Sequence, residues 1–79
     1  MSTGPARRRL APGKLLLSKW TAAAPVNKEK HFLVSGLIPP EAPGAGIDCI
    51  EMDALHSGRR FTMRWRELND TSCWLQGWL

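Results

Sequence analysis

Apolar and polar residues alternate along four segments of the chain, and a period of two is typical of half-buried β-strands. The four segments span residues 14–22, 31–38, 47–56 and 59–65. The last has the most regular alternation: its apolar face carries Phe61, Met63 and Trp65, and its polar face carries Arg60, Thr62 and Arg64. The pattern therefore predicts four strands, of which this last one is the clearest.

Turn residues separate the four segments. Pro25 cannot donate to a strand ladder, so the first strand is predicted to end there, and residues 27–30 then form a polar turn. Gly36 inside the second strand predicts a bulge. Residues 39–46 hold three of the six prolines and predict a surface loop, and Ser57-Gly58 predicts a two-residue hairpin turn.

The alternation stops after residue 68. Asp70 or Thr71 can cap a short helical turn that ends at Gly77, and Trp74 and Trp78 would then share one side of it. The loops are short enough for every strand pair to be antiparallel. The expected fold is mainly β: a small four-stranded curved sheet or SH3-like barrel with a short C-terminal helical turn.

The chain has 79 residues, enough for one small domain. Residues 1–13 are basic and interrupted by proline and glycine, which predicts a disordered arm, and residues 14–79 form the single β domain. Residues 1–30 carry seven basic residues and one acidic residue, whereas residues 31–79 carry four and six. This asymmetry favours an anionic partner, and the alternative is a solvated tail that keeps the protein soluble.

No motif of an enzyme is present, neither a phosphate-binding loop nor a nucleophile elbow. The two histidines and two cysteines lack the close pairs of zinc sites, so we expect no catalytic residue, no metal and no cofactor. Two cysteines are too few for the disulfide framework of a small secreted domain. No window reaches the ~18 apolar residues of a membrane span. We therefore expect a cytoplasmic protein that is not an enzyme.

The leading hypothesis is a binding module for RNA or another polyanion. Its phosphate contacts would come from Lys19, Lys28, Lys30, Arg59, Arg60, Arg64 and Arg66. The alternative for the hairpin arginines is the solvent face of an amphipathic strand, partly neutralised by Glu51 and Asp53.

The alternative function is a protein-interaction accessory or assembly factor. We expect Trp20 and Trp65 in the core, because each lies on an apolar strand face. Trp74 and Trp78 lie at the C-terminus and form either a plug or an exposed platform for a partner protein. Docking would use this pair together with the proline-rich loop.

Two blocks of sequence resemble a family of small tryptophan-rich proteins found in cyanobacteria and some gamma-proteobacteria. The blocks are residues 17–32, with Leu17-Ser18-Lys19-Trp20-Thr21-Ala22, Pro25 and Asn27 to Phe32, and residues 65–78, with Trp65-Arg66-Glu67-Leu68, Asp70, Trp74 and Gly77-Trp78. The resemblance implies a bacterial cytoplasmic context and brings no catalytic residue. It also draws attention to the polar stretch 27–32, and so to Asn27 and His31 as protein-binding candidates. The alternative there is a tight turn whose side chains bond the backbone.

Overall fold

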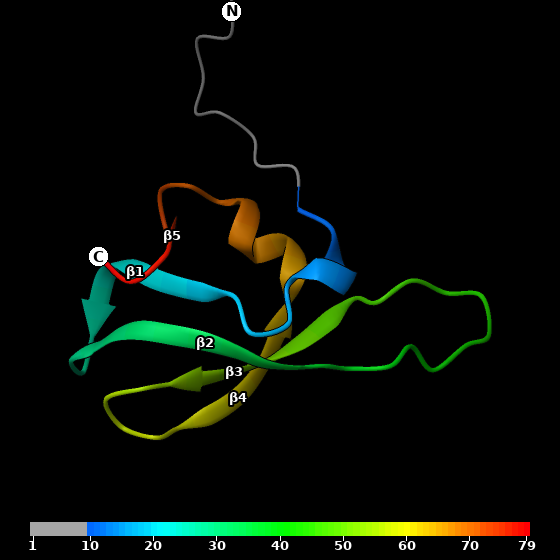
Figure 1. The fold of residues 1–79 in the computed structure, drawn as a ribbon, viewed down its shortest axis with the longest axis horizontal. Coiled ribbons are helices and arrows are strands. Elements are labelled where there is room, and N and C mark those ends of the chain that lie inside the picture. Colours follow the sequence, from blue (N-terminus) through cyan, green and yellow to red (C-terminus); the bar gives the residue numbers. More distant parts are fainter. Residues whose placement is uncertain (1–9) are drawn as a thin grey trace, which may run out of the picture.

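The computed structural model describes residues 10–79 and arranges them as an antiparallel sheet with two short 3-10 helices (Figure 1). The strands are β1 (Lys19–Val26), β2 (Glu29–Leu37), β3 (Cys49–Ala54), β4 (Arg60–Arg64) and β5 (Trp74–Gln76). The helices are η1 (Pro12–Lys14) and η2 (Trp65–Asn69). The strand order is β4-β3-β2-β1-β5, so β1 to β4 form a meander and the chain then returns to add β5 beside β1.

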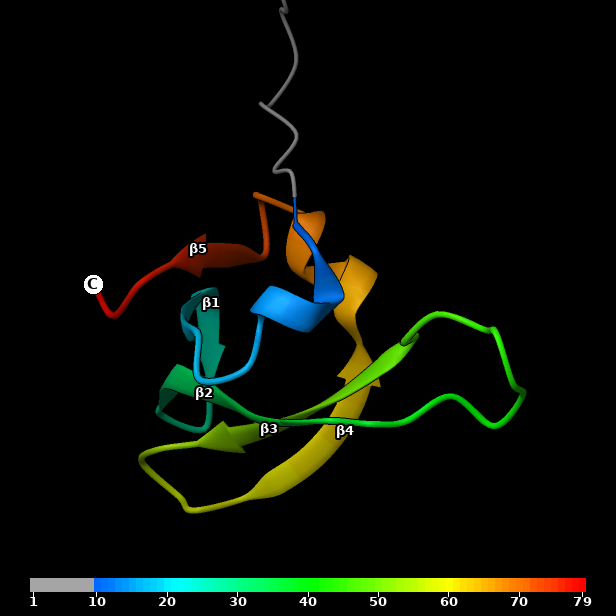
Figure 2. The same cartoon turned by 45° about the vertical axis from the view of Figure 1, so that its right-hand side comes forward.

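The mainly β, antiparallel prediction is confirmed, but its strand count is wrong. The sheet has five strands, and β4 and β5 are its two edges. It is therefore an open, twisted sheet and not an SH3-like barrel (Figure 2). The extra strand, β5, is only three residues long, which is too short to show an alternating pattern.

The helical turn near the C-terminus also lies elsewhere than predicted. It is η2, which follows β4 directly and buries Leu68 in the core. The Asp70 carboxylate does cap a turn, because it accepts the backbone N–H of Ser72. The chain then extends into β5, so Trp74 and Trp78 do not share the side of a helix.

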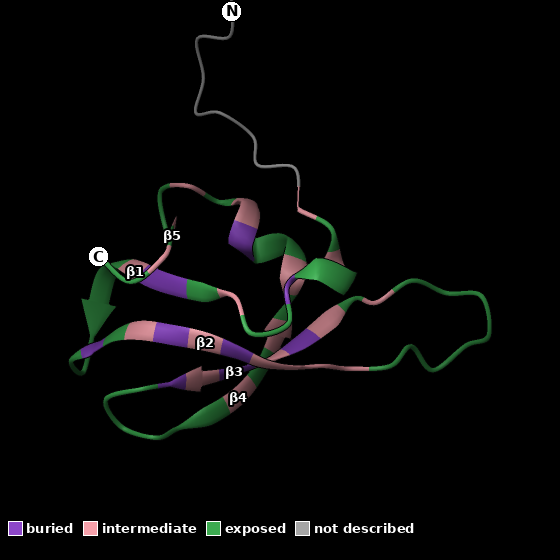
Figure 3. Ribbon diagram, in the orientation of Figure 1, coloured by how far each residue is buried: buried purple, intermediate pink, exposed green. Residues whose placement is uncertain are grey.

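One face of the sheet carries the core, which Figure 3 shows as the buried stretches along β1, β2 and β3. Its buried apolar side chains are Leu15, Trp20, Phe32, Val34, Ile50, Met52, Ala54 and Leu68. Those of β2 and β3 follow the predicted alternation. Phe61 and Met63 pack against this core but are only partly buried, because β4 is an edge strand. Trp65, the first residue of η2, packs there as well and is also only partly buried.

The first strand begins five residues later than the predicted start at residue 14, because a 3-10 helix and a turn precede it. Residues 12–14 form η1, and a turn follows in which the Ser18 N–H donates to the Leu15 carbonyl (2.9 Å). The strand also continues past Pro25 to Val26, with irregular pairing to β2.

The described residues include the last part of the predicted arm. Leu10 packs against the core and η1 follows it, so residues 10–13 belong to the domain. Residues 1–9, which include Arg7 to Arg9, lie outside the described residues.

The sequence predicts a four-residue turn at residues 27–30 and a two-residue turn at residues 57–58, but in the structure the first turn is the shorter one. Asn27 and Lys28 alone join β1 to β2, with φ of 55° and 63°, which is the geometry of a type I′ turn. The β3–β4 turn is longer than two residues: the Ala54 N–H donates to the Arg59 carbonyl (2.8 Å), which encloses residues 55–58. The bulge predicted at Gly36 is confirmed by a register shift there between β2 and β3.

Leu17 is held in a conformation that suits glycine. Its φ is 64° and its side chain is 64% exposed, so the strain is not offset by burial. A left-handed conformation costs an ordinary residue about 1 kcal/mol or more. We expect Leu17→Gly to raise the free energy of unfolding by up to about 1 kcal/mol, part of the gain being lost to the entropy of glycine. Urea titration measures this change, and a destabilised variant would show that Leu17 makes a compensating contact.

Candidate interaction surface

The four arginines of the predicted basic hairpin are all paired with carboxylates of the domain. The pairs and their N–O distances are Arg59–Glu29 (2.8 Å), Arg60–Asp53 (2.8 Å), Arg66–Asp48 (3.1 Å) and Arg64–Asp48 (3.7 Å). Arg60 also lies 3.6 Å from Glu51. The sequence predicts partial neutralisation by Glu51 and Asp53, which is correct for Arg60, but it does not indicate Glu29 or Asp48. These pairs reduce the positive potential that a phosphate would meet.

Glu29 joins the β1–β2 turn to the β3–β4 turn. Its side chain is only 10% exposed and accepts bonds from Arg59 Nε (2.9 Å), Arg59 Nη2 (2.8 Å) and Ser57 Oγ (2.6 Å). The hydrogen bonds from Arg59 and Ser57, in that order of importance, lower the pKa of Glu29 from 4.5 to about 2. The two turns are thereby held together at one end of the sheet.

This lowered pKa predicts loss of stability in acid. Because the folded pKa of Glu29 lies below the unfolded value, its contribution is complete above about pH 4.5 and is lost as the pH falls towards 2. The pKa values of Asp53, bonded by Arg60, and of Asp70, bonded by Ser72, are also lowered and act in the same direction. Glu29→Gln should flatten the decline of the melting temperature between pH 5 and 2. An unchanged decline would contradict the role given to Glu29.

Among residues 10–79, the lysines differ from the arginines in having no carboxylate partner. Within the described part of the chain, Lys14, Lys19, Lys28 and Lys30 form no ion pair, and all four are exposed. Residues 10–79 carry eight basic and seven acidic residues, so this part is close to neutral overall. The unpaired positive charge is thus concentrated on lysines.

The two C-terminal tryptophans have different environments. Trp74 packs edge-on against Phe32, with ring centres 5.0 Å apart, and so lies on the core face of the sheet. Trp78 is 42% exposed, donates its indole N–H to the Phe32 carbonyl (2.9 Å) and has Lys19 Nζ 4.8 Å from its ring centre. The pair therefore does not form a shared platform.

Residues 77–79, here called the C-terminal strap, are fastened to the sheet by Thr21. The Thr21 hydroxyl donates to the Gly77 carbonyl (2.6 Å) and accepts the Leu79 N–H (3.0 Å). Thr21 is only 1% exposed, although it projects from the strand face opposite that of its buried neighbour Trp20. The strap thus covers part of the outer face of β1. Trp78 contributes to this cover but stays partly exposed, so it is only in part the plug that the sequence analysis considers.

Three residues with exposed apolar side chains lie next to His31. Leu55 donates its backbone N–H to the His31 carbonyl (3.0 Å), His31 Nε2 lies 2.9 Å from the Leu79 backbone oxygen, and the ring of Trp78 lies 6.3 Å from that of His31. Leu55 is 45% exposed and Leu79 is 66% exposed. We call His31, Leu55, Trp78 and Leu79 the His31 surface. The strap and both hairpin turns lie at this end of the molecule (Figures 1 and 2).

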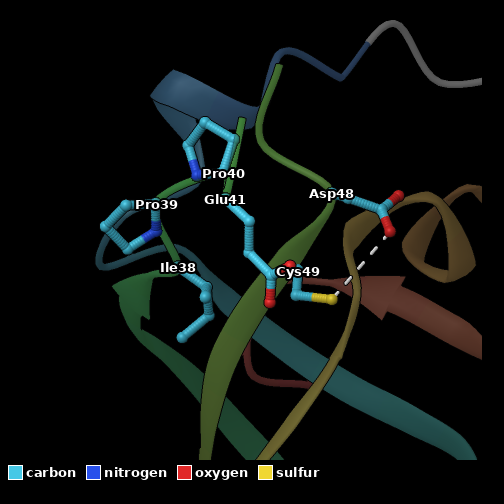
Figure 4. Close-up of a pocket in the computed structure, with 6 residues that line it drawn as sticks. All are labelled: Ile38, Pro39, Pro40, Glu41, Asp48 and Cys49. Atoms are coloured by element: carbon cyan, nitrogen blue, oxygen red, sulfur yellow. Dashed lines mark hydrogen bonds between the residues drawn. The ribbon is translucent and has the colours of Figure 1, made fainter. Parts of the chain in front are cut away.

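The proline-rich loop lies at the opposite end of the sheet in both views (Figures 1 and 2). Beneath its base is a hollow of about 230 Å³. Figure 4 shows the residues that line it, Ile38, Pro39, Pro40, Glu41, Asp48 and Cys49. The loop and Trp78, which the sequence analysis assigns to one docking site, therefore do not form one continuous surface (Figures 1 and 2). Asn27 lies in the turn at the His31 end of the sheet. Its positive φ agrees with the alternative given above for this stretch, a tight turn.

The described residues include two cysteines but no cluster of metal-ligating side chains. Cys49 and Cys73 are free thiols, half-buried and exposed respectively. Residues 10–79 hold no group of three or more His, Cys, Asp or Glu side chains placed to bind a metal ion. Neither helix in this range has the length and apolar character to cross a membrane.

The sequence of residues 18–79 matches the family described as "Tryptophan-rich protein (DUF2389)". No curated protein and no solved structure matches the chain. The match begins just before β1 and includes all five strands and the C-terminal strap. Most of the chain is thus covered, and the chain belongs to this family of tryptophan-rich proteins.

Proposed function

We propose that this chain is a non-enzymatic cytoplasmic interaction module that docks on a partner protein through the His31 surface. The observation that carries the proposal is the gathering of Leu55, Trp78 and Leu79 around His31 from distant parts of the chain. Large aromatic and aliphatic side chains of this kind are typical anchors of protein interfaces.

The rigidity of the surface supports docking. Trp78 is held by its bond to the Phe32 carbonyl and Leu79 by its bond to Thr21, so a partner would not have to order them. The two free cysteines agree with a reducing cytoplasm.

Site-specific photo-crosslinking in cells tests the proposal. p-Benzoylphenylalanine at position 55 replaces one large apolar side chain by another and so retains an apolar anchor there. We expect a discrete crosslinked product that contains one partner protein. The Leu79→Gln substitution should abolish this product, whereas Leu16→Gln, which changes another exposed leucine, should leave it intact. The same crosslinker at position 41, in the proline-rich loop, is the second control. No protein adduct from position 55, or one insensitive to Leu79→Gln, would overturn the proposal.

Binding of RNA or another polyanion is a second candidate, favoured by the unpaired lysines at the His31 end. If Lys19, Lys28 and Lys30 contacted phosphates, affinity for single-stranded RNA would fall with salt with a log–log slope of about −2, at ~0.7 per contact. Arg59, Arg60, Arg64 and Arg66 would add little, because each already has a carboxylate partner. A titration of poly(U) at several salt concentrations gives the slope, and a slope near zero excludes this candidate.

A further inference from the structure

We infer that the partner segment that fits the His31 surface is acidic as well as apolar, with carboxylates placed to meet Lys19 and Lys28. This inference rests on the proposed docking function and specifies its partner. It follows from which charges at this end of the sheet are already paired and which are not.

The acidic groups at this end are neutralised within the domain. Glu29 is enclosed by Arg59 and Ser57, and Asp53 accepts two bonds from Arg60, of 2.8 and 3.2 Å. These two side-chain carboxylates are therefore already bonded within the domain and offer little to a basic partner.

The cations at this end remain available. Lys19 lies over Trp78 with no carboxylate partner among the described residues, so its ammonium group can bind an anion next to the apolar anchor. Lys28 lies in the neighbouring β1–β2 turn, where it is exposed. Such exposed charges contribute mainly to the selection and orientation of the partner.

The backbone at Lys28 is a second, independent observation. It is the second residue of the type I′ turn, with φ of 63°, a position where glycine is strongly preferred. Fold stability alone thus favours glycine there. A lysine that costs stability at an exposed position points to a role for its charge.

The test uses the full chain and two fluorescein-labelled peptides that differ in one feature. In one peptide leucines are flanked by glutamates, and in the other every glutamate is replaced by glutamine. We expect the acidic peptide to bind about tenfold more tightly at low salt, and the difference to vanish at high salt. Fluorescence anisotropy gives both affinities.

Lys28→Gly is the informative variant, because it should raise the melting temperature while it removes at least half of the preference for the acidic peptide. Leu79→Gln should weaken both peptides alike, which shows that the apolar anchor is used. Arg64→Gln, at the far end of β4, is the matched charge control and should change neither affinity.

Equal affinity for the two peptides, or a preference that Lys28→Gly leaves intact, overturns the inference. Tight binding of poly(U) that depends on Lys28 but not on Leu79 also overturns it, in favour of nucleic acid. If the position-55 crosslink to a protein persists while the peptides do not discriminate, only the acidic-partner inference fails. If that crosslink is absent, the docking proposal fails as well.

Discussion

Trp20→Ala is expected to leave the chain largely unfolded at 25 °C. Trp20 is 1% exposed near the start of β1, and its indole N–H donates to Ser18 Oγ (2.8 Å). Replacing a buried tryptophan by alanine costs about 3–5 kcal/mol. A domain of this size rarely has more than roughly 3–5 kcal/mol of net stability, so the substitution removes most of it. Loss of chemical-shift dispersion in the amide NMR spectrum measures the unfolding.

Trp78→Ala is the matched control, since it removes the same side chain from a site that is 42% exposed. We expect it to cost about 1–2 kcal/mol and to leave a folded domain. A well-dispersed spectrum for Trp20→Ala, or equal losses for the two variants, would contradict the role of Trp20 as a main core residue.

The central strands could be predicted because their core residues recur with a period of two. Phe32 and Val34 in β2, and Ile50 and Met52 in β3, are buried as the alternation indicates. The same rule fails at residues 14–18, where three consecutive leucines continue the apolar pattern. Only the backbone geometry, with Leu17 at a φ of 64°, shows that the chain turns there before β1.

β5 could not be predicted, because its cause is not local. The Asp70 cap and the spacing of the tryptophans are signals for a helical turn, and a cap-like turn does form. The next residues are then drawn into the sheet by pairing with β1, where Trp74 lies opposite Ala22 and contacts Phe32. Tertiary contacts from residues more than 40 positions away thus override the local propensity.

The surface was predictable only in part for the same reason. Trp78 and His31 are among the sequence candidates, but their partners Leu55 and Thr21 are not. Leu55 looks like a strand residue in the alternation, and Thr21 looks like a polar position on an exposed face. Likewise, the ion pair of Arg59 with Glu29 joins residues 30 apart, beyond any local spacing rule.

Thr21→Val is expected to release the C-terminal strap and to disable the His31 surface without unfolding the domain. Valine keeps the shape of threonine but leaves the Gly77 carbonyl and the Leu79 N–H without their partner. Unsatisfied groups of this kind cost about 1–3 kcal/mol each when buried, and less once the strap detaches and meets water. The net loss in unfolding free energy should therefore stay near 1–2 kcal/mol.

Two measurements separate strap release from general destabilisation. Hydrogen exchange of the Trp78 indole N–H, which the strap holds against the Phe32 carbonyl, should accelerate far more than exchange of the amides in β2 and β3. The position-55 crosslink should disappear. Thr21→Ser retains the hydroxyl group and is the control, so it should preserve both the protection of the indole and the crosslink. Thr21→Val could instead accelerate hydrogen exchange uniformly across the whole sheet. That result would show that Thr21 stabilises the fold as a whole and that the strap is not a separable part of the binding surface.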